Sequence, residues 1–213
     1  MKRAGKLKRR TGMKRQAGMK RQTGMKRKTR ETDIRLGLDL GAGRAPDVRC
    51  PVPFLGHMLE LMSAHGGLGL VVRASGDTEV DDHHLAEDLG ICLGQALARA
   101  LGPRKGIRRY GSAVVPMDEA LVMAAVDISG RAHLSYGLRP GARRIKGFST
   151  DLVEEFLLGL ARNVPMTIHM VQFSGRNAHH VVEAGFKALG RALGEAFSPD
   201  SRFKGVPSTK GRL

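Results

Sequence analysis

The chain has 213 residues, 41% of them hydrophobic, which is enough to bury a core as one domain or as two small ones. No apolar run approaches the roughly 18 residues of a membrane helix, and the N-terminus lacks the apolar segment of a signal peptide, so we expect a cytoplasmic protein with no membrane contact. The formal charge of +16 suggests a nucleic-acid binder, but residues 1–30 hold 14 of the 36 Lys and Arg and no acidic residue, so the rest of the chain is nearly neutral.

Residues 1–30 are of low complexity, and a six-residue unit occurs three times between residues 11 and 28, as TGMKRQ, AGMKRQ and TGMKRK. Regular glycines and unrelieved positive charge predict a disordered tail. This tail is either an arm that makes nonspecific contacts with nucleic-acid phosphates or a solvated extension without a selected role. The second interpretation is favoured, because the tail has no aromatic residue to stack on bases.

A first half is expected at residues 31–118. Polar and apolar residues alternate over 33–40, which predicts a half-buried strand. A helix is expected over 54–64, with Leu55, Met58, Leu59 and Met62 as its apolar stripe and glycines 66 and 67 as its end. A strand at 68–74 and a second helix ending near residue 101 follow.

A second half is expected at residues 119–200, and the order of its elements is similar. Strands are predicted at 113–115, 120–128 and 132–136, then a helix at 151–161 with Thr150 as its N-cap, a strand at 166–173 and a helix to about residue 197. The fold class is therefore α+β, in which each half is a β-sheet covered by a helical layer on one face. Residues 201–213 remain as a C-terminal segment.

The segment DDHHLAED at 81–88 contains a pattern that recurs ninety-six residues later as HHVVE at 179–183. One such pattern could arise by chance on a solvated helix. Two copies, with Leu93-Gly94 matching Leu189-Gly190 at the same offset, indicate an internal duplication.

On a helix, the first histidine of each copy shares a face with the glutamate four residues later. The two adjacent histidines project about 100° apart, so we expect them to bind separate ions. Each copy is called a cassette below: His83, His84 and Glu87 form the first, and His179, His180 and Glu183 form the second.

Other histidines and the cysteines have plainer interpretations. His65 is as well explained by a helix C-terminus as by a substrate contact, and His133 and His169 are interpreted as structural. Cys50 and Cys92 lie in no metal-binding spacing, and two cysteines without a secretory signal predict reduced thiols.

Seven segments in order resemble the imidazoleglycerol-phosphate dehydratase family of histidine biosynthesis. They are FLGHML (54–59), DDHHLAED (81–88), KGIRRYG (105–111), PMDEA (116–120), DISGR (127–131), NAHHVVE (177–183) and PSTKG (207–211). The resemblance extends from about residue 29 to 213 and leaves only the tail uncovered.

The resemblance implies duplicated halves similar to the second domain of ribosomal protein S5, an assembly of 24 chains and two Mn²⁺ ions per active site. The implied metal ligands are His57, His83, His84, Glu87, Glu155, His179, His180 and Glu183, and imidazole and carboxylate donors suit Mn²⁺. The implied substrate contacts are Glu31, His57, His65, Arg109, Arg131, Ser208, Thr209 and Lys210, and four of these, Arg109, Arg131, Ser208 and Lys210, are suited to a phosphate. The implied catalytic groups are Glu31, Glu87 and Glu183, and Glu31, placed near the substrate of a neighbouring subunit, is the candidate for proton transfer.

The sequence departs from the family pattern at two positions. Gly56 stands where many members have aspartate, which removes a contact that would orient the following histidine. Glu155 is the duplication partner of His57, and an oxygen ligand there is still compatible with Mn²⁺.

The reaction implied is the removal of water from imidazole glycerol phosphate to give imidazole acetol phosphate. Two other interpretations are open at this stage: a nucleic-acid-binding protein with a basic tail that stores metal, and a dinuclear metallohydrolase. The confinement of the excess charge to the tail disfavours the first, and the motifs outside the cassettes disfavour the second.

Overall fold

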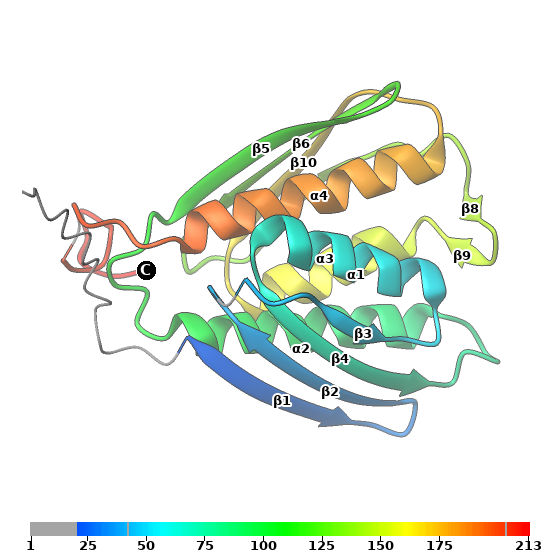
Figure 1. Cartoon of the computed structure of the whole chain (residues 1–213), viewed down its shortest axis with the longest axis horizontal. Coiled ribbons are helices and arrows are strands. Elements are labelled where there is room, and N and C mark those ends of the chain that lie inside the picture. Colours follow the sequence, from blue (N-terminus) through cyan, green and yellow to red (C-terminus); the bar gives the residue numbers. More distant parts are fainter. Residues whose placement is uncertain (1–20, 42, 203) are drawn as a thin grey trace, which may run out of the picture.

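The protein is described by a computed structural model that covers residues 21–41, 43–202 and 204–213; predictions about residues 1–20 lie outside the described residues. Two four-stranded sheets enclose four helices (Figure 1). The first sheet has the order β1-β2-β4-β3, formed by Gln22–Lys28, Thr32–Asp39, Gly69–Gly76 and Asp47–Arg49. The second has the order β5-β6-β10-β7, formed by Tyr110–Met117, Ala120–Asp127, Thr167–Ser174 and His133–Gly137.

The two halves have the same topology. In each, a hairpin (β1-β2 or β5-β6) pairs antiparallel with a later strand (β4 or β10), whose other neighbour (β3 or β7) runs parallel to it. Each half also has two helices: α1 Pro53–Gly66 and α2 His83–Leu101 in the first, α3 Leu152–Asn163 and α4 Ala178–Phe197 in the second. The predicted α+β class and the duplication are therefore confirmed.

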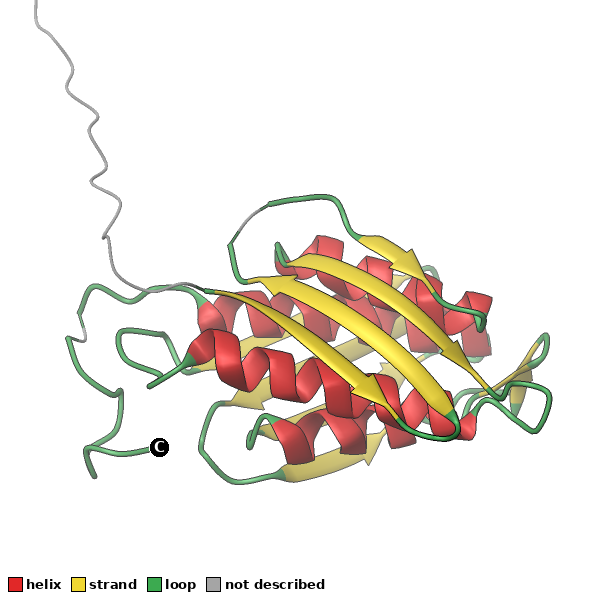
Figure 2. Ribbon diagram, turned by 90° about the horizontal axis from the view of Figure 1, so that it is seen from below, coloured by secondary structure: helices red, strands yellow, loops and turns green. Residues whose placement is uncertain are grey.

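The helical layers of the two halves pack against each other at the centre, as Figures 1 and 2 show from two sides. Each half's first helix packs against the last helix of the other half, so α1 contacts α4 and α3 contacts α2. These contacts are close: a Cβ at Gly190 would lie 2.2 Å from the Met62 carbonyl oxygen, and a Cβ at Gly90 would lie 2.2 Å from that of Phe156. This exchange places His57 of α1 beside the second cassette.

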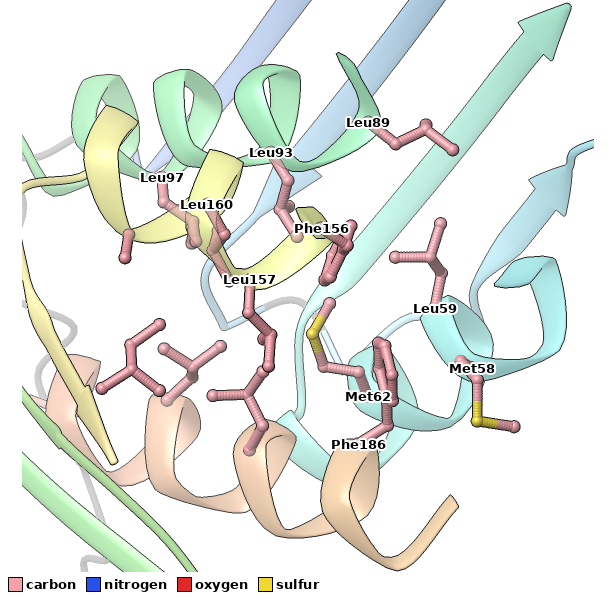
Figure 3. Close-up of a cluster of buried hydrophobic side chains, with 14 of the residues drawn as sticks. Met58, Leu59, Met62, Leu89, Leu93, Leu97, Phe156, Leu157, Leu160 and Phe186 are labelled. Carbon is pink, nitrogen blue, oxygen red and sulfur yellow. The ribbon is translucent and has the colours of Figure 1, made fainter. Parts of the chain in front are cut away.

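One hydrophobic core joins the two halves. Figure 3 shows Leu89, Leu93 and Leu97 of α2 facing the other helices. Phe156 of α3 and Phe186 of α4 lie with ring centroids 5.6 Å apart, and both side chains are buried. The apolar stripe expected for α1 is confirmed, because Leu55, Met58, Leu59 and Met62 are buried, and Gly67 ends the helix at a φ of 63°.

The prediction of a disordered tail to residue 30 is wrong for residues 22–28. The third copy of the six-residue unit forms β1, which pairs with β2 from Gln22 opposite Asp39 to Lys28 opposite Asp33. Met25 points inward and is 9% exposed, whereas Lys26 and Lys28 point outward. Side chains in this segment alternate between the two faces of the sheet, so Lys26 and Lys28 stay in solvent. Pairing with the apolar strand β2 then outweighs the repulsion between the positive charges.

Three further details differ from the prediction. Thr150 is not the N-cap of α3: its hydroxyl donates to the Ala142 carbonyl at 3.1 Å, and Asp151 occupies the cap position without a side-chain hydrogen bond. The short strand β3 was not predicted. The hairpin β8-β9, Arg144–Ile145 with Phe148–Ser149, is too short to give a sequence signal.

Candidate active site

The second cassette opens helix α4, as predicted. Asn177 caps this helix, because its side-chain oxygen accepts from the backbone N–H groups of His179 at 2.9 Å and His180 at 3.4 Å. One turn into the helix, Glu183 Oε2 accepts a hydrogen bond from His179 Nε2 at 2.9 Å. The expected i, i+4 contact is therefore present.

Glu183 is the meeting point of three side chains from two helices. It is 7% exposed, and its Oε2 lies 3.7 Å from Nε2 of His57 on α1, while its Oε1 lies 2.7 Å from Nζ of Lys187. Burial alone raises the pKa of Glu183, but hydrogen bonds from Lys187 and His179 outweigh it, so the net shift is downward. The carboxylate is thus held ionised at neutral pH. Lys187 was not predicted, although its position four residues after Glu183 is a signal for an ion pair.

The adjacent histidines of each cassette diverge as expected. The rings of His179 and His180 have centroids 6.3 Å apart at 80°, and those of His83 and His84 have the same separation at 87°. The second histidine of each pair contacts a carboxylate from a loop rather than the cassette glutamate.

His180 Nδ1 lies 2.7 Å from Glu119 Oε2, in the β5-β6 turn. The hydrogen bond with Glu119 raises the pKa of His180, and the hydrogen bond with His180, with help from backbone N–H groups at Arg176 and Asn177, lowers the pKa of Glu119 to about 2. In the first cassette, His84 Nδ1 lies 3.1 Å from Asp77 Oδ2, and this contact likewise raises the pKa of His84. Both histidines are therefore held by a carboxylate at the start of a helix.

Glu31 lies close to the first cassette of its own chain. It is an exposed residue in the turn between β1 and β2, and its carbonyl accepts from the Asp77 backbone N–H at 3.0 Å. The charge of Glu31 is among the causes that raise the pKa of His84, after the contribution of Asp77. The turn that carries Glu31, the loop at Asp77 and the start of α2 are thus one connected unit.

Glu155 lies on the face of α3 that packs on α2, the helix that carries the first cassette. It is half-buried and precedes Gly159 by one helical turn, so both lie on the same face of α3. A Cβ at Gly159 would lie 2.8 Å from the Glu87 carbonyl oxygen. Gly56, the other departure from the family pattern, faces β3: a Cβ there would lie 3.3 Å from that of Cys50.

The candidate phosphate-binding residues lie close together at the end of the molecule that is farther from the cassettes. Arg109 donates to both carboxylate oxygens of Asp127, at 2.7 and 3.1 Å, and to the Pro207 carbonyl at 2.9 Å. The C-terminal residue Leu213 packs against Gly130, where an added Cβ would lie 2.5 Å from its carbonyl carbon. The segment 207–213 is therefore folded back beside Arg109 and Gly130-Arg131.

Within this segment, Ser208 accepts through its hydroxyl from the Lys210 backbone N–H at 3.2 Å, and its carbonyl accepts from Gly211 at 3.0 Å. Arg131, Thr209 and Lys210 are exposed. A turn that presents a hydroxyl and an ammonium group, next to two guanidinium groups, is suited to a phosphate dianion.

The two groups of residues are separated by the length of the helices. Helices α2 and α4 start at the cassette end and finish at the end where the C-terminus lies (Figure 1). At about 1.5 Å per residue, the 20 residues of α4 span about 30 Å. One chain therefore does not bring its own C-terminal segment to its own cassettes. His65 lies between them, near the end of α1, where burial and the charges of Lys187 and Arg191 lower its pKa.

The donor types fit a hard divalent cation, since the cassettes offer imidazole nitrogens and ionised carboxylates. In residues 21–41, 43–202 and 204–213 no three His, Cys, Asp or Glu side chains are already arranged to hold an ion. The contact of His57 and His179 with one oxygen of Glu183 is the nearest approach to such a group.

Comparison with known proteins identifies the family. Residues 50–193 match the family described as imidazoleglycerol-phosphate dehydratase. The chain belongs to this family. Proteins of that name from Bacillus velezensis and Bacillus subtilis are 55% and 52% identical to it over 186 and 185 residues, in each case 87% of this chain and 95% of the relative.

Solved structures from the imidazoleglycerol-phosphate dehydratase family have the same fold. The crystal structure from Pyrococcus furiosus is 40% identical, with a TM-score of 0.78 over 89% of this chain and all of that one. The structure from Staphylococcus aureus is 37% identical, with a TM-score of 0.76 over 84% of this chain and 99% of that one. In the part of the chain that our structure describes, no helix is long and apolar enough to cross a membrane.

Proposed function

We propose that this protein is an imidazoleglycerol-phosphate dehydratase that converts imidazole glycerol phosphate to imidazole acetol phosphate and water, in the cytoplasmic synthesis of L-histidine. The single observation that carries the proposal is the environment of Glu183, a buried carboxylate contacted by His57 and His179 from two different helices. Family membership, with relatives above 50% identity, supports the same substrate.

In this proposal, the metal ligands are the residues of the two cassettes, and each cassette is joined by one residue from the helix that crosses it. His57 joins His179 and Glu183, and Glu155 joins the first cassette, because α1 packs on α4 and α3 packs on α2. Two Mn²⁺ ions per active site, when bound, supply Lewis-acid stabilisation of charge on the substrate imidazole. His84 and His180 diverge from their neighbours and serve a different ion from His83 and His179.

The phosphate of the substrate is bound by Arg109, Arg131, Ser208 and Lys210, with Thr209 in the same turn. Arg109 is fixed by Asp127, and through its bond to Pro207 it holds the C-terminal segment in place. His65, beside Lys187 and Arg191 of α4, contacts the part of the substrate between the metals and the phosphate, and Lys187 holds the Glu183 carboxylate in place. Binding the remote phosphate positions the reacting carbon.

Glu31 is the proton-transfer group in this mechanism. It is exposed at the tip of its turn and lies near His84 of its own chain, so in this proposal its carboxylate serves a carbon held at that first cassette and not, as the resemblance implies, the substrate of a neighbouring subunit. Glu87 and Glu183 hold charge at the cassettes. The proton taken from the carbon and the hydroxyl lost from its neighbour leave together as water and give an enol. Transfer of the enol hydroxyl proton to carbon then gives the ketone of imidazole acetol phosphate.

The separation of cassettes and phosphate site implies a homo-oligomer, for which we propose 24 chains. A substrate of this size cannot extend the about 30 Å between the two ends of α4. The C-terminal segment of one chain therefore serves the cassettes of another.

Complementation between variants tests the proposal. E183Q removes the cassette carboxylate and K210A removes the ammonium group of the phosphate site, so each homogeneous variant should form imidazole acetol phosphate far more slowly than wild type. Co-expressed chains should recover activity, because mixed oligomers contain sites that draw an intact cassette from one chain and an intact segment 207–213 from another. Mixed oligomers without recovered activity would contradict the shared site.

A further inference from the structure

A buried carboxylate lies directly beside the first cassette and has no counterpart in the second. Asp88 follows Glu87 and is 7% exposed, whereas the equivalent position after Glu183 is Ala184. Both Asp88 oxygens are used: Oδ1 lies 2.8 Å from Nε and Nη2 of Arg27, and Oδ2 accepts from the Thr32 hydroxyl at 2.5 Å. Arg27 comes from β1, the last copy of the repeated six-residue unit.

The hydrogen bonds continue from Thr32 to the turn that carries Glu31. The hydroxyls of Thr32 and Thr29 lie 3.2 Å apart. The Thr29 hydroxyl also accepts from the backbone N–H groups of Glu31 at 3.1 Å and Thr32 at 2.9 Å, and the Thr29 N–H donates to the Thr32 carbonyl at 2.9 Å. The position of the Glu31 backbone is thus fixed on one side by Thr29.

On its other side, Glu31 is bound through its carbonyl to the Asp77 N–H at 3.0 Å, and the Asp77 carboxylate contacts His84. Glu31 is therefore attached at two points, and both attachments lead to helix α2: one through Thr29, Thr32 and Asp88, the other through Asp77 and His84. Buried, fully used hydrogen-bonding groups of this kind hold a single geometry, because each broken bond leaves an unsatisfied polar atom.

We propose that Arg27, Asp88, Thr32 and Thr29 are positioning residues for the dehydration reaction, which set the place of the Glu31 carboxylate relative to the first cassette. The inference rests on the proposed function, in which Glu31 transfers the proton. The four residues act through Glu31 and do not touch the substrate. The competing explanation is purely structural: the network merely fastens the edge strand β1 to α2.

The experiment replaces the Thr29 hydroxyl, which is half-buried at the surface end of the network. T29V should lower kcat by about tenfold to a hundredfold, the effect of a displacement of about 1 Å at a catalytic group, with KM, manganese content and oligomer size unchanged. T29S restores the hydroxyl and should restore kcat. R27M should act in the same direction, and R27K should rescue only in part, because lysine lacks the forked donor geometry.

A matched control is available in the repeat. Arg15 occupies the same place in the first six-residue copy as Arg27 in the third, and R15M should leave kcat, KM and thermal stability at the wild-type values. If T29V lowers only the melting temperature and keeps wild-type kcat at a temperature well below it, the network is structural and the inference is wrong. If wild type itself forms no imidazole acetol phosphate, the proposed function fails and the inference fails with it, a result distinct from an active wild type with an active T29V.

Discussion

Asp127 holds Arg109 through two hydrogen bonds, of 2.7 and 3.1 Å, and leaves the remaining guanidinium nitrogen to bind the Pro207 carbonyl. The side chains of both residues are mostly buried, at 15% and 20% exposure. Arg109 therefore connects the second sheet to the C-terminal segment, and its orientation depends on a residue that sequence analysis did not single out for a role.

D127N tests this connection. The variant keeps one acceptor but removes the charge, so Arg109 is less firmly held and segment 207–213 is released. Hydrogen bonds to charged groups contribute about 1.5–3 kcal/mol, which corresponds to a loss of about tenfold to a hundredfold in kcat/KM. Steady-state kinetics with limited proteolysis of the C-terminus measures both effects. Unchanged kinetics with an unchanged proteolysis pattern would contradict the role of Asp127.

Lys210 tests the phosphate site more directly. K210A should lower kcat/KM about tenfold or more, because one charge-assisted contact to the phosphate is lost, while manganese content stays the same. R212A is the matched control: it removes a nearby exposed cation with no assigned role. An analogue without the phosphate should bind equally poorly to wild type and K210A, and a preference of wild type for that analogue would place Lys210 elsewhere.

Manganese stoichiometry tests the cassettes. Elemental analysis of the active enzyme should find about two Mn²⁺ per chain, and H179A or E183Q should lower that number and the activity together. H133A is the control, because His133 is an exposed histidine on β7 beside His169 and belongs to no cassette. An active wild type with one ion per chain or none would overturn the two-metal proposal.

The contact of His180 with Glu119 predicts a pH effect on metal loading. Metal binding requires neutral imidazole, and Glu119 raises the pKa of His180, so protons compete with the metal to a higher pH than for an unperturbed histidine. E119Q lowers that pKa towards about 6.5, so the midpoint of manganese loading should move to lower pH. Titration of bound manganese against pH measures the midpoint, and a shift to higher pH would contradict the assignment.

The contact of His180 with Glu119 also makes the stability of the metal-free protein depend on pH. Because the folded-state pKa of His180 is raised, the contact stabilises the fold fully below the unfolded-state pKa of about 6.5 and the stabilisation is lost as pH rises through the folded-state value. The Glu119 contribution is complete only above its unfolded-state pKa of 4.5 and is lost as pH falls towards about 2. Thermal melts of metal-free wild type and E119Q should therefore differ most between about pH 4.5 and 6.5 and converge above the raised pKa of His180.

The helices and most of the strands could be predicted from sequence because their apolar patterns are regular. Residues 33–40 alternate strictly, and the α1 stripe repeats at helical spacing, so each element was placed within a few residues of its position. The cassettes could be predicted because duplication repeats a rare pattern. Their pairing with α1 and α3 could not, since helix crossing between halves depends on close backbone contacts such as Gly190 on Met62, which leave no local pattern.

The remaining misses have physical causes as well. Strand β1 was not predicted because its sequence is mostly charged and Met25 is its one buried apolar residue. The strand is stabilised by its pairing with β2 and by the hydrogen bond of Arg27 with Asp88. Asp127 acts through a tertiary contact with Arg109 that no sequence spacing specifies. Lys187 lies four residues after Glu183, a spacing that does signal an ion pair, so this contact could have been predicted.

The boundary between tail and enzyme gives the last prediction. A deletion of residues 1–28 removes β1 with Met25 and Arg27, so it leaves the buried Asp88 without its charged partner and exposes one edge of β2. Breaking a fully buried charge pair from one side costs about 3–5 kcal/mol, and this pair costs less because the Arg27 side chain is 33% exposed. With the burial of Met25 lost as well, we expect this variant to be destabilised or insoluble. A deletion of residues 1–20 keeps β1 and should retain wild-type turnover, melting temperature and oligomer size. If the tail binds nucleic acid, that binding should disappear in the shorter deletion too and should weaken steeply with salt in the full chain. Equal stability of the two deletions, measured by thermal melts, would show that β1 contributes nothing to the fold.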